Sequence, residues 1–197
     1  MSFPWTRAAL RALAVLAASV LLAACDGGAP SFQGSDISGT HLGQGVSLTD
    51  QDGQPVALKD YAGKVVVVFF GFTQCPDVCP TSLAELAQVM QKLGKDADDV
   101  QVVLITVDPE RDTPPVLGRY VKAFDPRFVG LTGTPDQIRQ AAASFKAYYA
   151  KVPAADGNYS MDHTAAFYLL DKQGEARVLA NNTAGVDALA HDIRQLL

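Results

Sequence analysis

Apolar and polar positions along the chain divide it into short strands and helices. Residues 46–58 alternate on either side of a Gln-Asp-Gly-Gln turn, which predicts a β-hairpin. Residues 64–72 form a continuous β-branched and aromatic run, typical of a central strand covered on both faces. Residues 100–107 predict a second buried strand of the same kind. The middle of the chain therefore predicts a sheet with a buried centre.

Apolar residues at helical spacing recur between these strands. The spacing predicts helices over residues 82–93, 113–123, 134–145 and 186–197, the second and third opened by Thr-Pro caps. Further strands are expected at residues 128–131, 164–170 and 176–180, with an extended segment at 147–152. This order predicts an α/β protein with a thioredoxin-like fold, an N-terminal hairpin and an inserted helical unit.

The N-terminal residues have the pattern of a secretion signal. Basic Arg7 and Arg11 precede an apolar run over residues 12–22, which is shorter than the roughly 20 residues that a permanent membrane helix needs. The run ends in Leu-Ala-Ala-Cys, which resembles a bacterial lipobox and makes Cys25 the expected lipidation site. Asp26 after it resembles an inner-membrane retention signal.

These features predict three parts of the chain. Residues 1–24 are interpreted as a lipoprotein signal peptide, the Gly- and Ser-rich residues 25–44 as a flexible tether, and residues 45–197 as one domain. The expected location is the bacterial cell envelope, with the protein lipid-anchored on the periplasmic face of the inner membrane. The net charge of −5 without basic clusters argues against nucleic-acid binding.

The remaining two cysteines lie in a segment where a ligand-binding site is expected. Cys75 and Cys79 follow the predicted central strand and precede a helix, the edge of α/β sheets where ligands bind. The helix N-terminus favours thiolates, so both sulfurs are expected to deprotonate easily. A structural disulfide and a thiol–disulfide enzyme remain open, but the latter typically has Cys-x-x-Cys. Cys-x3-Cys favours one soft ion, and copper(I) accepts few ligands.

The third ligand is expected to be a histidine. His163 lies in a polar segment, interpreted as a loop, directly before the apolar strand at 164–170, where it can face the cysteines. Asp162 is a possible partner that orients its ring. His41 is interpreted as a tether residue and His191 as a surface or packed residue of the last helix.

Three separate motifs resemble the Sco/SenC family. They are Gly-Phe-Thr-Gln-Cys-Pro-Asp-Val-Cys-Pro at 71–80, Val-Asp-Pro-Glu-Arg-Asp-Thr at 107–113, and Asp-His-Thr at 162–164, followed by Phe-Tyr-Leu-Leu-Asp at 167–171. The resemblance implies a thioredoxin fold and copper held by Cys75, Cys79 and His163. It also implies a loop near the site that begins at Asp108, and a role at the binuclear copper site of cytochrome c oxidase.

The resemblance favours a copper chaperone rather than an enzyme. Its expected partners are the copper-site subunit of the oxidase, a copper donor protein and the membrane, and its cargo is Cu(I), Cu(II) or both. The first rival function is a thiol–disulfide reductase that keeps the oxidase cysteines reduced, and the second is a peroxiredoxin-type peroxidase. Reductases of this fold normally carry a proline just before the strand facing the cysteines, and here the nearest is Pro153.

Overall fold

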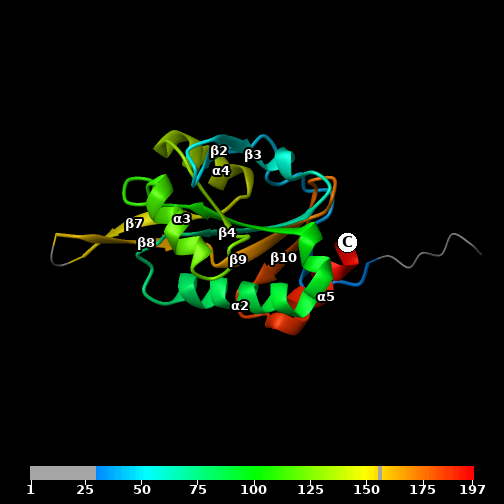
Figure 1. Ribbon diagram of the computed structural model, residues 1–197. Helices are drawn as coiled ribbons and strands as arrows, with labels where there is room; N and C mark the ends of the chain where they lie inside the picture. The colour runs from blue at the N-terminus through cyan, green and yellow to red at the C-terminus, as the bar shows by residue number, and fades with distance from the viewer. Residues whose placement is uncertain (1–29, 155–156) are drawn as a thin grey trace, which may run out of the picture. The chain divides into compact units, whose positions relative to one another are not determined.

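The computed structural model describes residues 30–154 and 157–197 (Figure 1). The predictions of a signal peptide at 1–24 and of lipidation at Cys25 lie outside these residues. Within the described part of the chain, no helix is both long enough and apolar enough to cross a membrane. Residues 31–197 form one compact unit, and only this unit is described below.

A single mixed sheet forms the centre of this unit. Among the described residues its strand order is β1-β10-β9-β4-β5-β6-β2-β3. The strands are β1 (Ser35–Asp36), β2 (Ser47–Asp50), β3 (Pro55–Ala57), β4 (Val65–Gly71), β5 (Val100–Thr106), β6 (Val129–Thr132), β9 (Ala166–Leu170) and β10 (Ala176–Asn181). Strands β4, β5 and β6 are parallel, and β9 runs antiparallel to β4. Every residue of β4 is buried, which confirms it as the central strand.

Helices cover both faces of this sheet. They are α2 (Val78–Leu93), α3 (Pro114–Lys122), α4 (Pro135–Ser144) and α5 (Val186–Leu196), with short 3-10 segments at Leu58–Tyr61 and Gly94–Asp99. Figure 1 shows α2 and α5 side by side beneath the sheet and α4 on the opposite side. The buried residues of β4 alternate between the faces. Phe70 contacts Phe145 at the end of α4, while Phe69 contacts Phe167 and His163 on the other face.

The segment before the last hairpin differs from its prediction. Residues 159–163, expected to be a loop, form strand β8 (Tyr159–His163), which pairs with β7 (Tyr149–Pro153) in a separate two-stranded sheet. This β7–β8 hairpin projects from the unit in Figure 1. The loop interpretation was wrong. It followed from the polar composition of the segment, but Met161 is buried between two exposed neighbours, and this alternation is the pattern of a strand.

The domain also begins earlier than residue 45. Strand β1 pairs with β10, and Leu42 is buried in the core. The backbone N–H groups of Gln33 and Gly34 donate to the buried carboxylate of Asp192 in α5, at 2.7 and 2.8 Å. Residues 31–44 are therefore part of the folded unit rather than tether. The Gly- and Ser-rich composition gave no sign of this, because these contacts are made mainly by the backbone.

Candidate metal centre

Three segments that are distant in sequence meet at one edge of the sheet. Gly71 at the end of β4 pairs with Thr106 at the end of β5, so the loops that follow these parallel strands emerge together. The first loop carries Cys75 and leads into α2. Strand β9 begins at the same edge because it runs antiparallel to β4, and this places the preceding His163 beside the cysteines.

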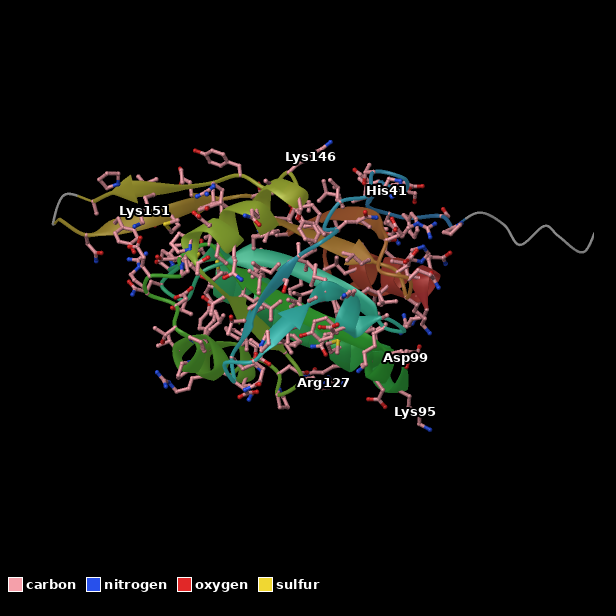
Figure 2. The ribbon with its side chains drawn as sticks, turned by 90° about the horizontal axis from the view of Figure 1, so that it is seen from above. His41, Lys95, Asp99, Arg127, Lys146 and Lys151 are labelled. Atoms are coloured by element: carbon pink, nitrogen blue, oxygen red, sulfur yellow. The ribbon has the colours of Figure 1, made fainter. Side chains whose placement is uncertain are left out.

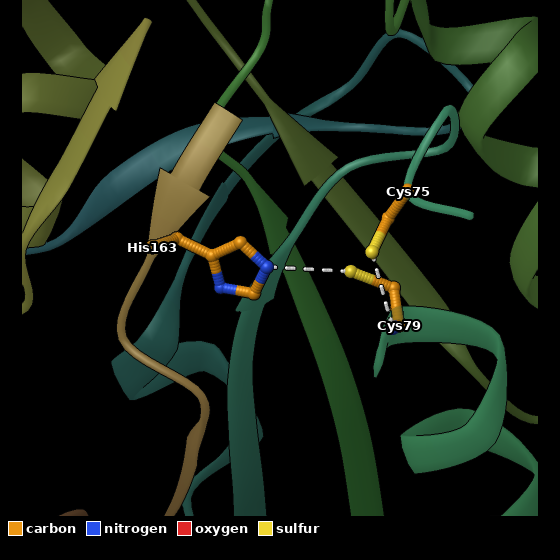
Figure 3. Close-up of side chains that lie close together, drawn as sticks. All are labelled: Cys75, Cys79 and His163. Carbon is orange, nitrogen blue, oxygen red and sulfur yellow. Dashed lines mark hydrogen bonds between the residues drawn. The ribbon is translucent and has the colours of Figure 1, made fainter. Parts of the chain in front are cut away.

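Cys75, Cys79 and His163 form a compact cluster (Figure 3). Their ligand atoms all lie within 4.8 Å of one another. The Nε2 atom of His163 is 3.5 Å from the Sγ atom of Cys79, and the backbone N–H of Cys79 donates to the Sγ atom of Cys75 at 3.3 Å. The structure thus brings together the three residues that the sequence analysis selected as metal ligands.

The spacing of these atoms suits one ion. In zinc sites, metal–sulfur bonds are about 2.3 Å and metal–nitrogen bonds about 2.0–2.1 Å, so two ligands of one ion stand at most about 4.6 Å apart. Separations of no more than 4.8 Å need only a small contraction to reach that geometry. Two thiolates and an imidazole form a soft donor set that suits copper or zinc.

The His163 ring is fixed in the orientation that a ligand needs. Its Nδ1–H donates to the carbonyl oxygen of Thr164 at 3.1 Å, which directs the Nε2 lone pair toward Cys79. The rings of Phe69 and Phe72 pack edge-on against the imidazole. Burial lowers the pKa of His163 against the opposing effects of Thr164 and Asp162, so the neutral ligand form is favoured. Asp162, named in the sequence analysis as a possible partner of this ring, is exposed, and the ring's Nδ1–H donates to Thr164 rather than to Asp162.

Burial gives the two sulfurs different surroundings. Cys75 is partly exposed, whereas Cys79 lies in the first turn of α2 and is fully buried. Removal from water raises the pKa of the Cys79 thiol, with a backbone hydrogen bond to Phe72 acting against it. The expectation that both sulfurs deprotonate easily was therefore wrong for Cys79, because its burial disfavours the thiolate.

Asp112 anchors the cysteine loop and was missed in the sequence analysis. Its buried carboxylate accepts hydrogen bonds from the backbone N–H and the hydroxyl of Thr73, at 3.1 and 2.5 Å, and from the hydroxyl of Thr106 at 2.6 Å. Burial raises the pKa of Asp112, and these hydrogen bonds oppose the rise. The acid-rich motif at 107–113 was the available signal: a loop near the site was expected there, but no role was assigned to Asp112 itself.

The other residues noted in the sequence take separate places. Asp108 is buried, forms an ion pair with Arg111 and accepts a hydrogen bond from the Tyr159 hydroxyl at 2.9 Å. His41 forms an exposed pair with Glu175, and His191 contacts the carbonyl oxygen of Ser31. Neither of these histidines belongs to the cluster of Cys75, Cys79 and His163.

The comparisons with known proteins identify the family. The SCO1/SenC family model matches residues 35–197. The chain belongs to the SCO1/SenC family. The SCO2-like protein of Rickettsia felis is 42% identical over 136 residues, covering 68% of this chain and 66% of that protein. The match thus spans just under two thirds of that relative's own length.

Solved SCO1/SenC structures share the fold. The structure of Bradyrhizobium japonicum ScoI with copper bound has a TM-score of 0.74 and 45% identity, covering 79% of this chain and 99% of that one. A structure of BsSco has a TM-score of 0.65 and 26% identity, covering 84% and 98%. BsSco is described as a member of the Sco family of cytochrome c oxidase assembly proteins with a disulfide switch. These likenesses confirm the prediction of a thioredoxin-like fold.

Proposed function

We propose that this chain is a copper chaperone of the cell envelope that delivers one copper ion to the binuclear copper site of cytochrome c oxidase. The observation that carries the proposal is the convergence of Cys75, Cys79 and His163 within 4.8 Å. The copper-bound state of the Bradyrhizobium relative supports copper as the ion. The BsSco description supports oxidase assembly as the process. Lipidation at Cys25 would hold the domain at the membrane where the oxidase subunit resides.

Differences in exposure suggest an order for copper release. Cys75 and His163 are both partly exposed, whereas Cys79 is fully buried. An incoming thiolate of the oxidase subunit therefore reaches the ion from the side of Cys75 and His163, and Cys79 is the last ligand to leave. Copper uptake requires both sulfurs reduced, because a disulfide has no thiolate to offer.

The rival function is a thiol–disulfide reductase. The adjacent sulfurs and the disulfide switch described for BsSco favour it. The ring of His163, held with Nε2 toward Cys79, is what a metal carrier needs and what a reductase does not require. The two functions therefore differ in their dependence on His163.

Copper loading of the reduced protein tests the proposal. We expect one copper ion per chain, with a visible absorption band from thiolate–copper charge transfer for Cu(II). His163→Ala is expected to lose tight copper binding and keep any activity in reducing disulfides. The matched control is His191→Ala, which removes an imidazole that lies outside the cluster. A reduced wild-type protein that binds no copper, or a His163→Ala variant that binds it as tightly, would contradict the chaperone function.

A further inference from the structure

Arg111 lies between the two halves of the metal centre. Its Nη1 atom donates to the side-chain oxygen of Gln74, the residue directly before Cys75, at 3.1 Å. The same atom donates to the carbonyl oxygen of Tyr159 in β8 at 2.9 Å. One guanidinium thus joins the loop that carries Cys75 to the strand that carries His163.

A second set of contacts fixes Arg111 itself. Its Nε atom forms an ion pair with Asp108, and the other oxygen of that carboxylate accepts a hydrogen bond from the Tyr159 hydroxyl. The guanidinium also stacks on the Tyr159 ring, with its carbon 3.8 Å from the ring centroid. Arg111, Asp108 and Tyr159 therefore form a closed unit, which we name the Arg111 clamp.

The β7–β8 hairpin needs such a clamp because it is not part of the main sheet. Its strands pair with each other in a separate two-stranded sheet and project from the unit (Figure 1). A two-stranded hairpin is only marginally stable by itself. The connection to β9 and the buried Met161 place His163 near the cysteine loop, and side-chain contacts of the hairpin add to how firmly it is held there. Lys151 on β7 adds an exposed ion pair to Glu110, of the kind that contributes little.

The clamp is not built for stability alone. The Nη2 atom of Arg111 is buried and finds no hydrogen-bond partner among the described residues. A buried donor without a partner costs free energy. A neutral side chain filling this space would avoid the cost, but it would not bridge three segments with directed donors.

We propose that Arg111 is a positioning residue that sets how long copper stays in the site, by holding the His163 hairpin against the Cys75 loop. This inference rests on the proposed copper-binding function. Loss of the clamp lets the hairpin and the loop separate, so that the His163 bond to copper opens more often. The expected effect is faster copper release with the three ligands still present.

The test compares copper release from the reduced, Cu(I)-loaded protein to a chelator in excess. Arg111→Gln is expected to load one copper ion and to release it about tenfold faster, because directed bonds from a charged donor are lost. Arg111→Lys should not rescue the rate, since a single ammonium cannot reproduce the planar fork of donors. The Cu(II) form of Arg111→Gln should also show a shifted visible band.

Arg127→Gln is the matched control. Arg127 donates to both oxygens of Asp125, and Figure 2 shows it away from the hairpin that carries Lys151. The Arg127→Gln variant should release copper at the wild-type rate.

Gln74→Ala is a second test variant, for use if Arg111→Gln does not fold. It removes an exposed hydrogen-bond partner of Arg111 and should also accelerate copper release. The positioning role of Arg111 would be overturned if each of Arg111→Gln and Gln74→Ala that folds released copper at the wild-type rate and showed an unshifted visible band. A wild-type protein that loads no copper would instead overturn the proposed function.

Discussion

At the scale of single residues, burial decides how the candidate ligands behave. The sequence placed Cys75 and Cys79 at a helix start and so predicted easy deprotonation for both. The structure buries Cys79 completely, and desolvation raises the pKa of its thiol. Burial of a side chain depends on packing from distant segments, so spacing along the chain could not predict this. His163, expected as the third ligand, lies in one cluster with both cysteines.

The raised pKa of Cys79 predicts a pH dependence for copper uptake. The neutral thiol is favoured in the free protein, and copper binding must release its proton. The apparent affinity should therefore fall as pH falls, by about tenfold per pH unit for one released proton. His163 adds no proton release above its ordinary pKa, because burial lowers its pKa further. Competition with a chelator at several pH values measures the slope, and a flat profile near neutral pH would contradict it.

At the scale of elements, apolar periodicity predicted most of the fold. The central strand and the closing helix appear where the pattern placed them. The helix after the cysteines ends at Leu93 as expected but begins at Val78 rather than at residue 82, so it includes Cys79. Strand β1 could not be predicted, because Ser35 and Asp36 are both exposed and only their backbone pairs with β10. Strand β8 had a usable signal in its buried Met161, but its polar composition concealed it.

The two predicted Thr-Pro caps differ in the structure. The Thr134 hydroxyl oxygen accepts a hydrogen bond from the backbone N–H of Gln137. The side-chain oxygen of Gln137 accepts one from the backbone N–H of Thr134, which completes a capping box. Thr113 holds the equivalent position before α3, but its side chain makes no capping bond. Thr134→Ala should therefore lower the free energy of unfolding by about 1 kcal/mol. Thr113→Ala should lower the free energy of unfolding by clearly less, because no capping hydrogen bond is lost.

Urea denaturation of the two variants checks this difference. Parallel slopes with a shifted midpoint would show that only the stability of the folded state has changed. Equal losses in both variants would contradict the assignment of the single cap to Thr134.

At the scale of the whole folded unit, the N-terminal boundary has the largest consequence. Residues 31–44 contribute the strand at the edge of β10 and the N–H donors to Asp192. Asp192 is only 1% exposed, so its carboxylate depends on those donors. The boundary at residue 45 that composition indicated would cut through this packing.

A protein beginning at residue 45 should consequently be less stable than one beginning at residue 30. The shorter protein loses the burial of Leu42 and leaves Asp192 without its two backbone donors. A loss of roughly 3 kcal/mol is expected, because the burial of Leu42 and the two hydrogen bonds to a charged group are lost together. Thermal unfolding of the two proteins compares them directly. Equal midpoints would show that residues 31–44 do not contribute to stability.

The central claim is that an imidazole and two sulfurs from distant segments bind one copper ion. X-ray absorption at the copper edge, recorded on the reduced and loaded protein, counts the neighbours of the metal by element. We predict two sulfur neighbours from Cys75 and Cys79 and one nitrogen neighbour that is absent in His163→Ala. A copper ion with no sulfur neighbours, or with a nitrogen shell that His163→Ala leaves unchanged, would contradict the account.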